Sequence, residues 1–111
     1  MRFEFGAVVL VRFPFTNQTG SKQRPAVVIS NRAYNTTKPD VVIMAITTKL
    51  RQDSEPGEVL IDQWQAAGLL KPSAIKPVFA TIEQALIVRQ LGTLGDGDQA
   101  ALRKAIGEVL G

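Results

Sequence analysis

The sequence predicts a mainly β (α+β) fold, a small β-barrel followed by an amphipathic C-terminal helix. Most apolar residues fall in short runs rich in valine and isoleucine, which is typical of strands. Stretches rich in glycine, proline, asparagine and threonine separate these runs and favour loops. Residues 96–110 most clearly repeat their apolar side chains with the period of a helix. Many short strands followed by one packing helix favour a small barrel.

The first half of the chain is expected to supply three strands. Their ranges are 7–13, 25–30 and 40–47, and the last is placed centrally because it is apolar throughout. Pro14 ends the first strand, since proline lacks the N–H that a strand ladder requires. Residues 31–40 are assigned to a loop from their content of Asn, Thr and Pro.

The second half is expected to contain shorter elements before the final helix. In order, they are an alternating strand at 58–62, a helical turn at 62–70 ended by Gly68, and strands at 73–76 and 77–82. The pattern of residues 83–94 fits either a helix or a strand, and the β-branched Ile87 and Val88 favour a short turn followed by a strand.

The final helix is the most clearly patterned element. One stripe along it is formed by Leu102, Ala105, Ile106, Val109 and Leu110. Asp96 is expected to cap the helix, with Gln99 completing the spacing of a capping box. Asp98 adds negative charge to the first turn, where the helix dipole favours it.

Length and composition limit what the chain can be. Its 111 residues suit one domain, residues 1–111. The sequence has neither cysteine nor histidine, which excludes disulfides, zinc held by thiolates or imidazoles, and a Ser-His-Asp triad. Its carboxylates lack the spacing of a metal motif, so no metal site is expected. It has no apolar run of 18 residues and no signal-peptide pattern, so no membrane span and a cytoplasmic location are expected.

Charge is distributed unevenly along the chain. Residues 1–51 hold eight basic and two acidic residues, a net charge of +6, whereas residues 52–111 hold five basic and eight acidic residues, a net charge of −3. A basic half suits a polyanion such as nucleic acid. It equally suits an ordinary surface or an acidic protein partner.

Arg24 is the first candidate functional residue. A guanidinium carries a fork of donors that matches two phosphate oxygens, and Pro25 restrains the backbone beside it. The loop before it supplies Thr16, Ser21 and Lys22, which could enclose a phosphate. The alternative is a solvated loop with a charge at the strand end.

A second group of candidates follows the central strand. Thr47 and Thr48 could present hydroxyls to a phosphate, with Lys49 and Arg51 as nearby cations. Threonine is also an ordinary strand residue, so this signal is weak by itself. Trp64 is expected to pack in the core or at a partner interface rather than to stack on a base.

The motifs FPFT, GSKQRPAVVIS and, about twenty residues later, AITT resemble the MazF/PemK-like toxins of bacterial toxin–antitoxin systems. The likeness continues through GLLKPSAIKP and LIVRQLGTL to the final helix. It implies an SH3-like barrel that forms a homodimer, binds a cognate antitoxin and cleaves single-stranded RNA as an endoribonuclease, without metal or other cofactor. The family's catalytic arginine and threonine match Arg24 and Thr47, and the serine of its loop matches Ser21.

The resemblance also implies a reaction that needs no histidine. The 2′-hydroxyl of RNA attacks the adjacent phosphorus, leaving a 2′,3′-cyclic phosphate and a 5′-hydroxyl. The residues expected to bind RNA are Thr16, Ser21, Lys22, Thr48, Lys49 and Arg51. Two departures from the family are Ala7, where many members are acidic, and a short loop between Gly20 and Arg24, so the RNA sequence preference does not carry over.

Two other functions stay open at this point. A related barrel serves toxins that bind DNA gyrase and cleave nothing, although such a toxin has no need of an arginine–threonine phosphate site. The third possibility is an inactive barrel that binds RNA and leaves it intact.

Overall fold

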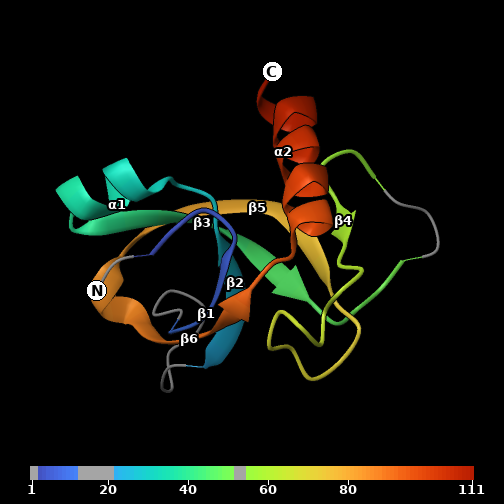
Figure 1. Cartoon of the computed structure of the whole chain (residues 1–111), viewed down its shortest axis with the longest axis horizontal. Coiled ribbons are helices and arrows are strands. Elements are labelled where there is room, and N and C mark those ends of the chain that lie inside the picture. Colours follow the sequence, from blue (N-terminus) through green and yellow to red (C-terminus); the bar gives the residue numbers. More distant parts are fainter. Residues whose placement is uncertain (1–2, 13–21, 52–54) are drawn as a thin grey trace.

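The computed structural model describes residues 3–12, 22–51 and 55–111 and is built on one antiparallel sheet (Figure 1). Its strand order is β4-β5-β3-β2-β1-β6. The strands are β1 (Ala7–Arg12), β2 (Gln23–Val28), β3 (Asp40–Thr47), β4 (Val59–Leu60), β5 (Ala74–Glu83) and β6 (Ile87–Thr93). The helices are α1 (Arg32–Thr37), the 3₁₀ turn η1 (Gln84–Leu86) and α2 (Asp96–Leu110).

The predicted mainly β, α+β class is confirmed, with α2 following the strands. Closure into a barrel is not: among the described residues the sheet is open, with β4 and β6 at its two edges. The sheet is strongly curved all the same, and in Figure 1 β5 arches over β1, β2 and β6.

Two strand predictions were wrong in detail. The segments 73–76 and 77–82 form one strand, β5, because Pro77 lies where the β3–β5 register shifts, between Ile46↔Ile75 and Met44↔Phe79. A proline is tolerated at such an irregularity, since no ladder hydrogen bond is required of it. The second strand begins at Gln23 rather than residue 25, so Arg24 lies inside it.

Helix α1 occupies part of the range 31–40 that was predicted as a loop. The Asn31 side chain accepts a hydrogen bond from the Tyr34 N–H at 2.9 Å and so caps the helix. Six residues are too few to show a helical period, so the helix could not be predicted from periodicity. The buried Asn35 donates to the carbonyl oxygens of Phe3 and Ser30 and ties the helix to the N-terminal segment.

The predicted cap of α2 was also wrong. Gly95 is the N-cap, and no side chain bonds there, while Asp96 lies in the first turn. Gln99 instead donates to the Leu94 carbonyl at 2.8 Å. Asp98 is in the first turn as expected, but it is buried, and its carboxylate accepts the N–H groups of two residues of a distant segment, Asp62 at 3.0 Å and Gln63 at 2.9 Å.

Side chains alternate across the sheet and fill two cores. Core 1, under α2, includes Val8, Val27, Met44, Ile75, Leu102 and Ala105. Core 2, on the other face, includes Val9, Val11, Ala26, Val28, Val41 and Ile43. Because successive residues of a strand face opposite sides, these two sets determine where every other residue of β1, β2 and β3 points.

The segment 62–70 forms hydrogen-bonded turns ended by Gly68, as predicted. The N–H groups of Leu69 and Gly68 donate to the carbonyls of Trp64 and Gln65, which is the bonding of a Schellman motif, and Gly68 has φ +87°. The segment lies backbone to backbone on β6: a Cβ at Gly68 would collide with the Leu91 carbonyl oxygen.

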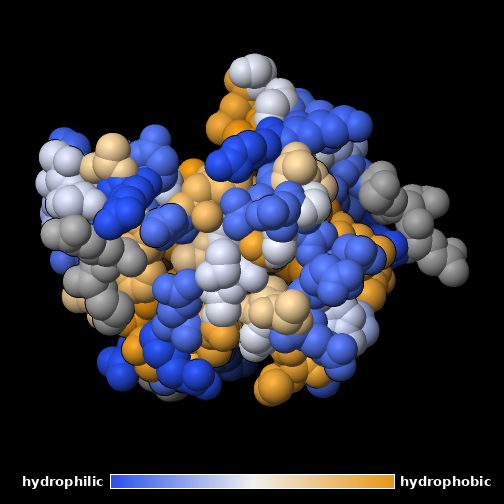
Figure 2. Space-filling model, viewed as in Figure 1, coloured by the Kyte–Doolittle hydropathy of each residue, from blue (hydrophilic) through white to orange (hydrophobic). Residues whose placement is uncertain are grey.

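The surface seen in Figure 2 is mainly hydrophilic, but a recess between α1 and α2 has an apolar base, over the position of β5 in Figure 1. Val78 of β5 is 54% exposed.

Neither α-helix of the described part of the chain is long and apolar enough to cross a membrane.

We expect Gly68→Ala to lower the free energy of unfolding by more than about 2 kcal/mol, because a Cβ there meets both positive φ and the backbone of β6. Gly107→Ala is the matched control, since nothing lies within 4 Å of its Cβ and alanine favours a helix interior. Urea unfolding of both variants measures the difference, and equal stability would contradict this packing.

Candidate functional site

Arg24 is the second residue of β2 and lies near the N-terminal end of this strand. It pairs with Val11 of β1, which is buried in core 2, so the Arg24 side chain leaves the sheet on the core 2 face. Ala26 and Val28 lie buried on the same face further along the strand, whereas Arg24 is exposed. Its backbone is therefore fixed by the ladder while its guanidinium is accessible.

Thr47 is the last residue of the neighbouring strand, β3. The β2–β3 ladder ends at Ala26↔Ala45, and continuing this register by two residues places Arg24 across from Thr47. Thr47 follows Ile46, which is buried in core 1, so its side chain also lies on the core 2 side. The two predicted catalytic residues thus share one face and one end of the sheet.

The hydroxyl of Thr47 has a defined role in the turn that follows. Its Oγ1 accepts a hydrogen bond from the Lys49 N–H at 3.0 Å. Because the oxygen acts as the acceptor in this bond, its own hydrogen stays available to a ligand. Thr47 is therefore oriented as a hydrogen-bond donor.

The predicted binding cations differ in their surroundings. Lys22 and Lys49 are exposed and form no ion pair with a carboxylate of the described residues. Arg51 is exposed too, but its Nη1 lies 2.8 Å from Glu55 and 3.8 Å from Glu58. Its charge is thus partly neutralised by its neighbours in the chain.

The other predicted residues are placed only in part. Thr48 is exposed, directly after Thr47. Thr16 and Ser21 lie outside the described residues. Trp64 is partly buried and packs against core 1, which confirms its predicted structural role.

A pocket of about 570 Å³ lies beside these residues, on the core 1 face; we call it the apolar pocket. It is lined by Leu10, Pro25, Thr48, Gly68, Leu69, Leu70, Lys71, Ser73, Arg89 and Leu91. Its floor is the paired strands β2, β1 and β6, with Leu10 opposite both Pro25 and Arg89, and one wall is the turn segment that ends at Gly68.

Sequence reasoning missed Lys71 and Arg89, which lie in the motifs GLLKPS and LIVRQL. Nothing in either motif distinguishes a site cation from a surface one. They belong to the apolar pocket only because β6 pairs with β1 and the turn segment packs on β6.

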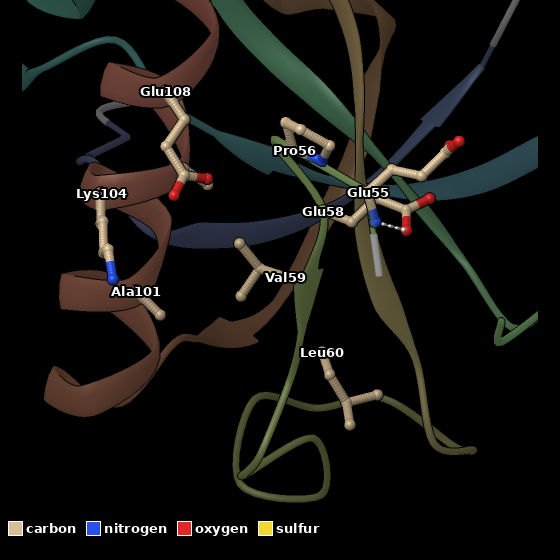
Figure 3. A pocket seen from close by; sticks show the side chains of 9 residues that line it. Glu55, Pro56, Glu58, Val59, Leu60, Ala101, Lys104 and Glu108 are labelled. Atoms are coloured by element: carbon tan, nitrogen blue, oxygen red, sulfur yellow. Dashed lines mark hydrogen bonds between the residues drawn. The ribbon is translucent and has the colours of Figure 1, made fainter. Parts of the chain in front are cut away.

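A second hollow, of about 740 Å³, lies between α2 and β4 (Figure 3). Glu108 and Lys104 project from α2 on one side, and Glu55 and Glu58 lie on the other. It is the larger hollow, but three carboxylates beside one lysine do not suit a phosphate. The strand end with Arg24, Thr47 and Lys49 is therefore the better candidate for binding an anion.

The chain belongs to a known toxin family. The family described as PemK-like, MazF-like toxin of type II toxin-antitoxin system matches residues 4–110, nearly the whole chain. The predicted resemblance is thereby confirmed.

Several solved structures share the fold. An endoribonuclease from a mycobacterial species, in complex with its cognate antitoxin, is 20% identical with a TM-score of 0.79, covering 96% of this chain and 93% of that one. Mycobacterium tuberculosis toxin MazF-mt6 is 25% identical with a TM-score of 0.77, covering 94% and 95%. The MazE-MazF complex (Form-III) from Deinococcus radiodurans is 21% identical with a TM-score of 0.79, covering 99% and 97%. A comparison with curated protein sequences found no match.

Proposed function

We propose that this chain is the toxin of a toxin–antitoxin pair and a metal-independent, sequence-selective endoribonuclease acting on single-stranded RNA. The observation that carries the proposal is the placement of Arg24 and Thr47 at one end of adjoining strands, on the same face of the sheet. Membership of the toxin family and the endoribonuclease among the solved neighbours support it.

The reaction uses a nucleophile that the substrate brings. The 2′-oxygen bonds to phosphorus while the bond from phosphorus to the 5′-oxygen breaks, giving a 2′,3′-cyclic phosphate and a 5′-hydroxyl. The proton of the 2′-hydroxyl passes to solvent. The protein's task is to hold the strand in line and to stabilise charge on the phosphoryl oxygens.

Arg24 and Thr47 divide this task. The guanidinium of Arg24 donates to two phosphoryl oxygens and neutralises the charge that develops on them. A guanidinium stays protonated near neutral pH and is a poor general base, so Arg24 acts instead as the general acid toward the leaving 5′-oxygen and regains its proton from water. Thr47 donates its hydroxyl hydrogen to a phosphoryl oxygen, with Lys49 N–H holding the hydroxyl in place.

The remaining predicted residues bind the strand on either side. Lys22 and Lys49 contact flanking phosphates, and Thr48, Thr16 and Ser21 contribute hydroxyls. Arg51 contributes less because of its carboxylate partners. We assign the activity to residues 1–111 as a single domain that works as a cytoplasmic homodimer and is inhibited by a cognate antitoxin, as the MazE-MazF neighbour suggests.

The first test is incubation of the protein with labelled single-stranded RNA in excess chelator. We expect discrete fragments ending in 2′,3′-cyclic phosphate, no cleavage of an all-deoxy strand, and loss of cleavage in Arg24→Ala. Arg32→Ala is the matched control, because Arg32 is also exposed but lies on α1, 3.9 Å from Glu4. Intact RNA in every lane would favour the inactive RNA binder or the gyrase-directed toxin, which a topoisomerase assay separates.

Thr47 gives a second test. We expect Thr47→Val to lower the cleavage rate about 10²-fold, the usual effect of removing one donor to a developing oxyanion, whereas Thr47→Ser keeps most of the rate. Single-turnover rates at saturating protein provide the measurement, with thermal unfolding to show that both variants fold. Equal rates for Val and Ser would remove Thr47 from the mechanism.

Lys49 and Arg51 give a third test, on binding. Each phosphate contact contributes about 0.7 to the slope of log affinity against log salt for a single strand. We expect Lys49→Gln to lower this slope by about that amount and Arg51→Gln to lower it clearly less, because Arg51 already faces two carboxylates. Fluorescence anisotropy with a 2′-deoxy-substituted strand measures both, and equal effects would contradict the difference.

A further inference from the structure

We infer that the apolar pocket binds the base of a nucleotide next to the scissile phosphate, so that Leu70, Lys71 and Arg89 help to determine which RNA sequence is cleaved. The inference rests on the proposed function, since it needs an RNA strand bound at the N-terminal end of β2 and the C-terminal end of β3.

The position of the pocket supports this assignment. Two residues of its lining, Pro25 and Thr48, directly follow Arg24 and Thr47 in the chain. Consecutive Cα atoms are about 3.8 Å apart, so the phosphate site and the pocket lie within the reach of one nucleotide. They open on opposite faces of the sheet, because Pro25 pairs with Leu10 on the core 1 side while Arg24 pairs with Val11 on the core 2 side.

This arrangement suits the geometry that cleavage requires. In a stacked strand the 2′-oxygen is not in line with the bond that must break, and the nucleotide has to be splayed for attack. Proteins recognise single-stranded RNA by holding bases splayed from the backbone. A base on one face of the strand ends and its phosphate on the other would keep the nucleotide in that conformation.

The chemistry of the lining fits a nucleotide. Four leucines and Pro25 make up half of the ten described lining residues, and about 570 Å³ is within the range of small-ligand sites. Lys71 and Arg89 are the charged residues of the lining among the described residues, both are exposed, and no carboxylate of that part of the chain lines the pocket. An apolar cavity with cations at its rim accepts a flat base while the cations donate hydrogen bonds to acceptors on the edge of that base.

The pocket is also held in shape by the fold. Its wall follows the turn segment ended by Gly68, which lies directly on the backbone of β6 and is anchored further back by the buried Asp98 carboxylate. Ser73 is buried, and its hydroxyl donates to the Lys71 carbonyl at 2.8 Å. Leu70 stands at the rim with 93% of its surface exposed, so its side chain is accessible to a ligand.

The test compares binding of two non-cleavable strands by the full chain. Both carry the site mapped for the wild type with a 2′-deoxy substitution at the cleaved nucleotide, and one of them lacks the base next to the scissile phosphate. We expect removal of the base to weaken wild-type binding about tenfold or more. In Leu70→Ser and Lys71→Gln the same removal should weaken binding by less than about threefold, since the pocket no longer holds the base.

Matched substitutions outside the pocket serve as controls. Leu110→Ser and Lys104→Gln change the same residue types on α2, where Leu110 is 65% exposed, and should keep the full effect of base removal. If the pocket variants lose as much affinity on base removal as the wild type does, the base binds elsewhere and the inference is wrong. That result would favour an apolar side chain of a protein partner as the occupant of the pocket.

Failure of the proposed function is seen separately. In that case the wild type does not cleave RNA, and no cleavage site can be mapped. The binding comparison is then made on homopolymers of the four bases, each measured beside a strand of the same length that lacks the bases. Loss of the base effect in the pocket variants would still support the pocket assignment, and an unchanged effect would overturn it.

Discussion

The antiparallel register of β2 between β1 and β3 is the constraint on which the rest of the structure depends. It pairs Ala26 with Val9 on one side and with Ala45 on the other. Both faces of β2 are buried, Val27 in core 1 and Ala26 in core 2, so a slip of one residue would reverse every side chain at a high cost in apolar burial. The same register sets Arg24 on the face of Thr47, so core packing determines which side chains share the strand end.

The turn segment 62–70 links stability to the site in a different way. Its contact with β6 is made by backbone atoms, which only glycine at position 68 allows. The Asp98 carboxylate holds the start of the segment from α2, and the segment in turn forms one wall of the apolar pocket. Helix α2 therefore supports a pocket that it does not itself line.

The basic residues of the first half of the chain differ in whether a carboxylate lies beside them. Arg51 is paired with Glu55 and Glu58, while Lys22 and Lys49 keep exposed charges near the strand end. A site of this kind, with a fixed guanidinium and an oriented hydroxyl, stabilises charge well and removes protons poorly. It suits the proposed substrate, which carries its own nucleophile, and it requires neither histidine nor cysteine, both of which the sequence lacks.

Much of the fold was determined by the sequence alone. The period of two in the apolar runs and the period of 3.6 in residues 96–110 predicted the strands and α2, because local periodicity reflects which face an element buries. The motifs around Arg24 and Thr47 predicted the family. Tertiary structure decided the rest: the open sheet, the capping of α1 by Asn31, the partners of Arg51, and the meeting of Arg89 with Leu10. The pairing of β6 with β1 joins segments about eighty residues apart, and no local pattern encodes such a contact.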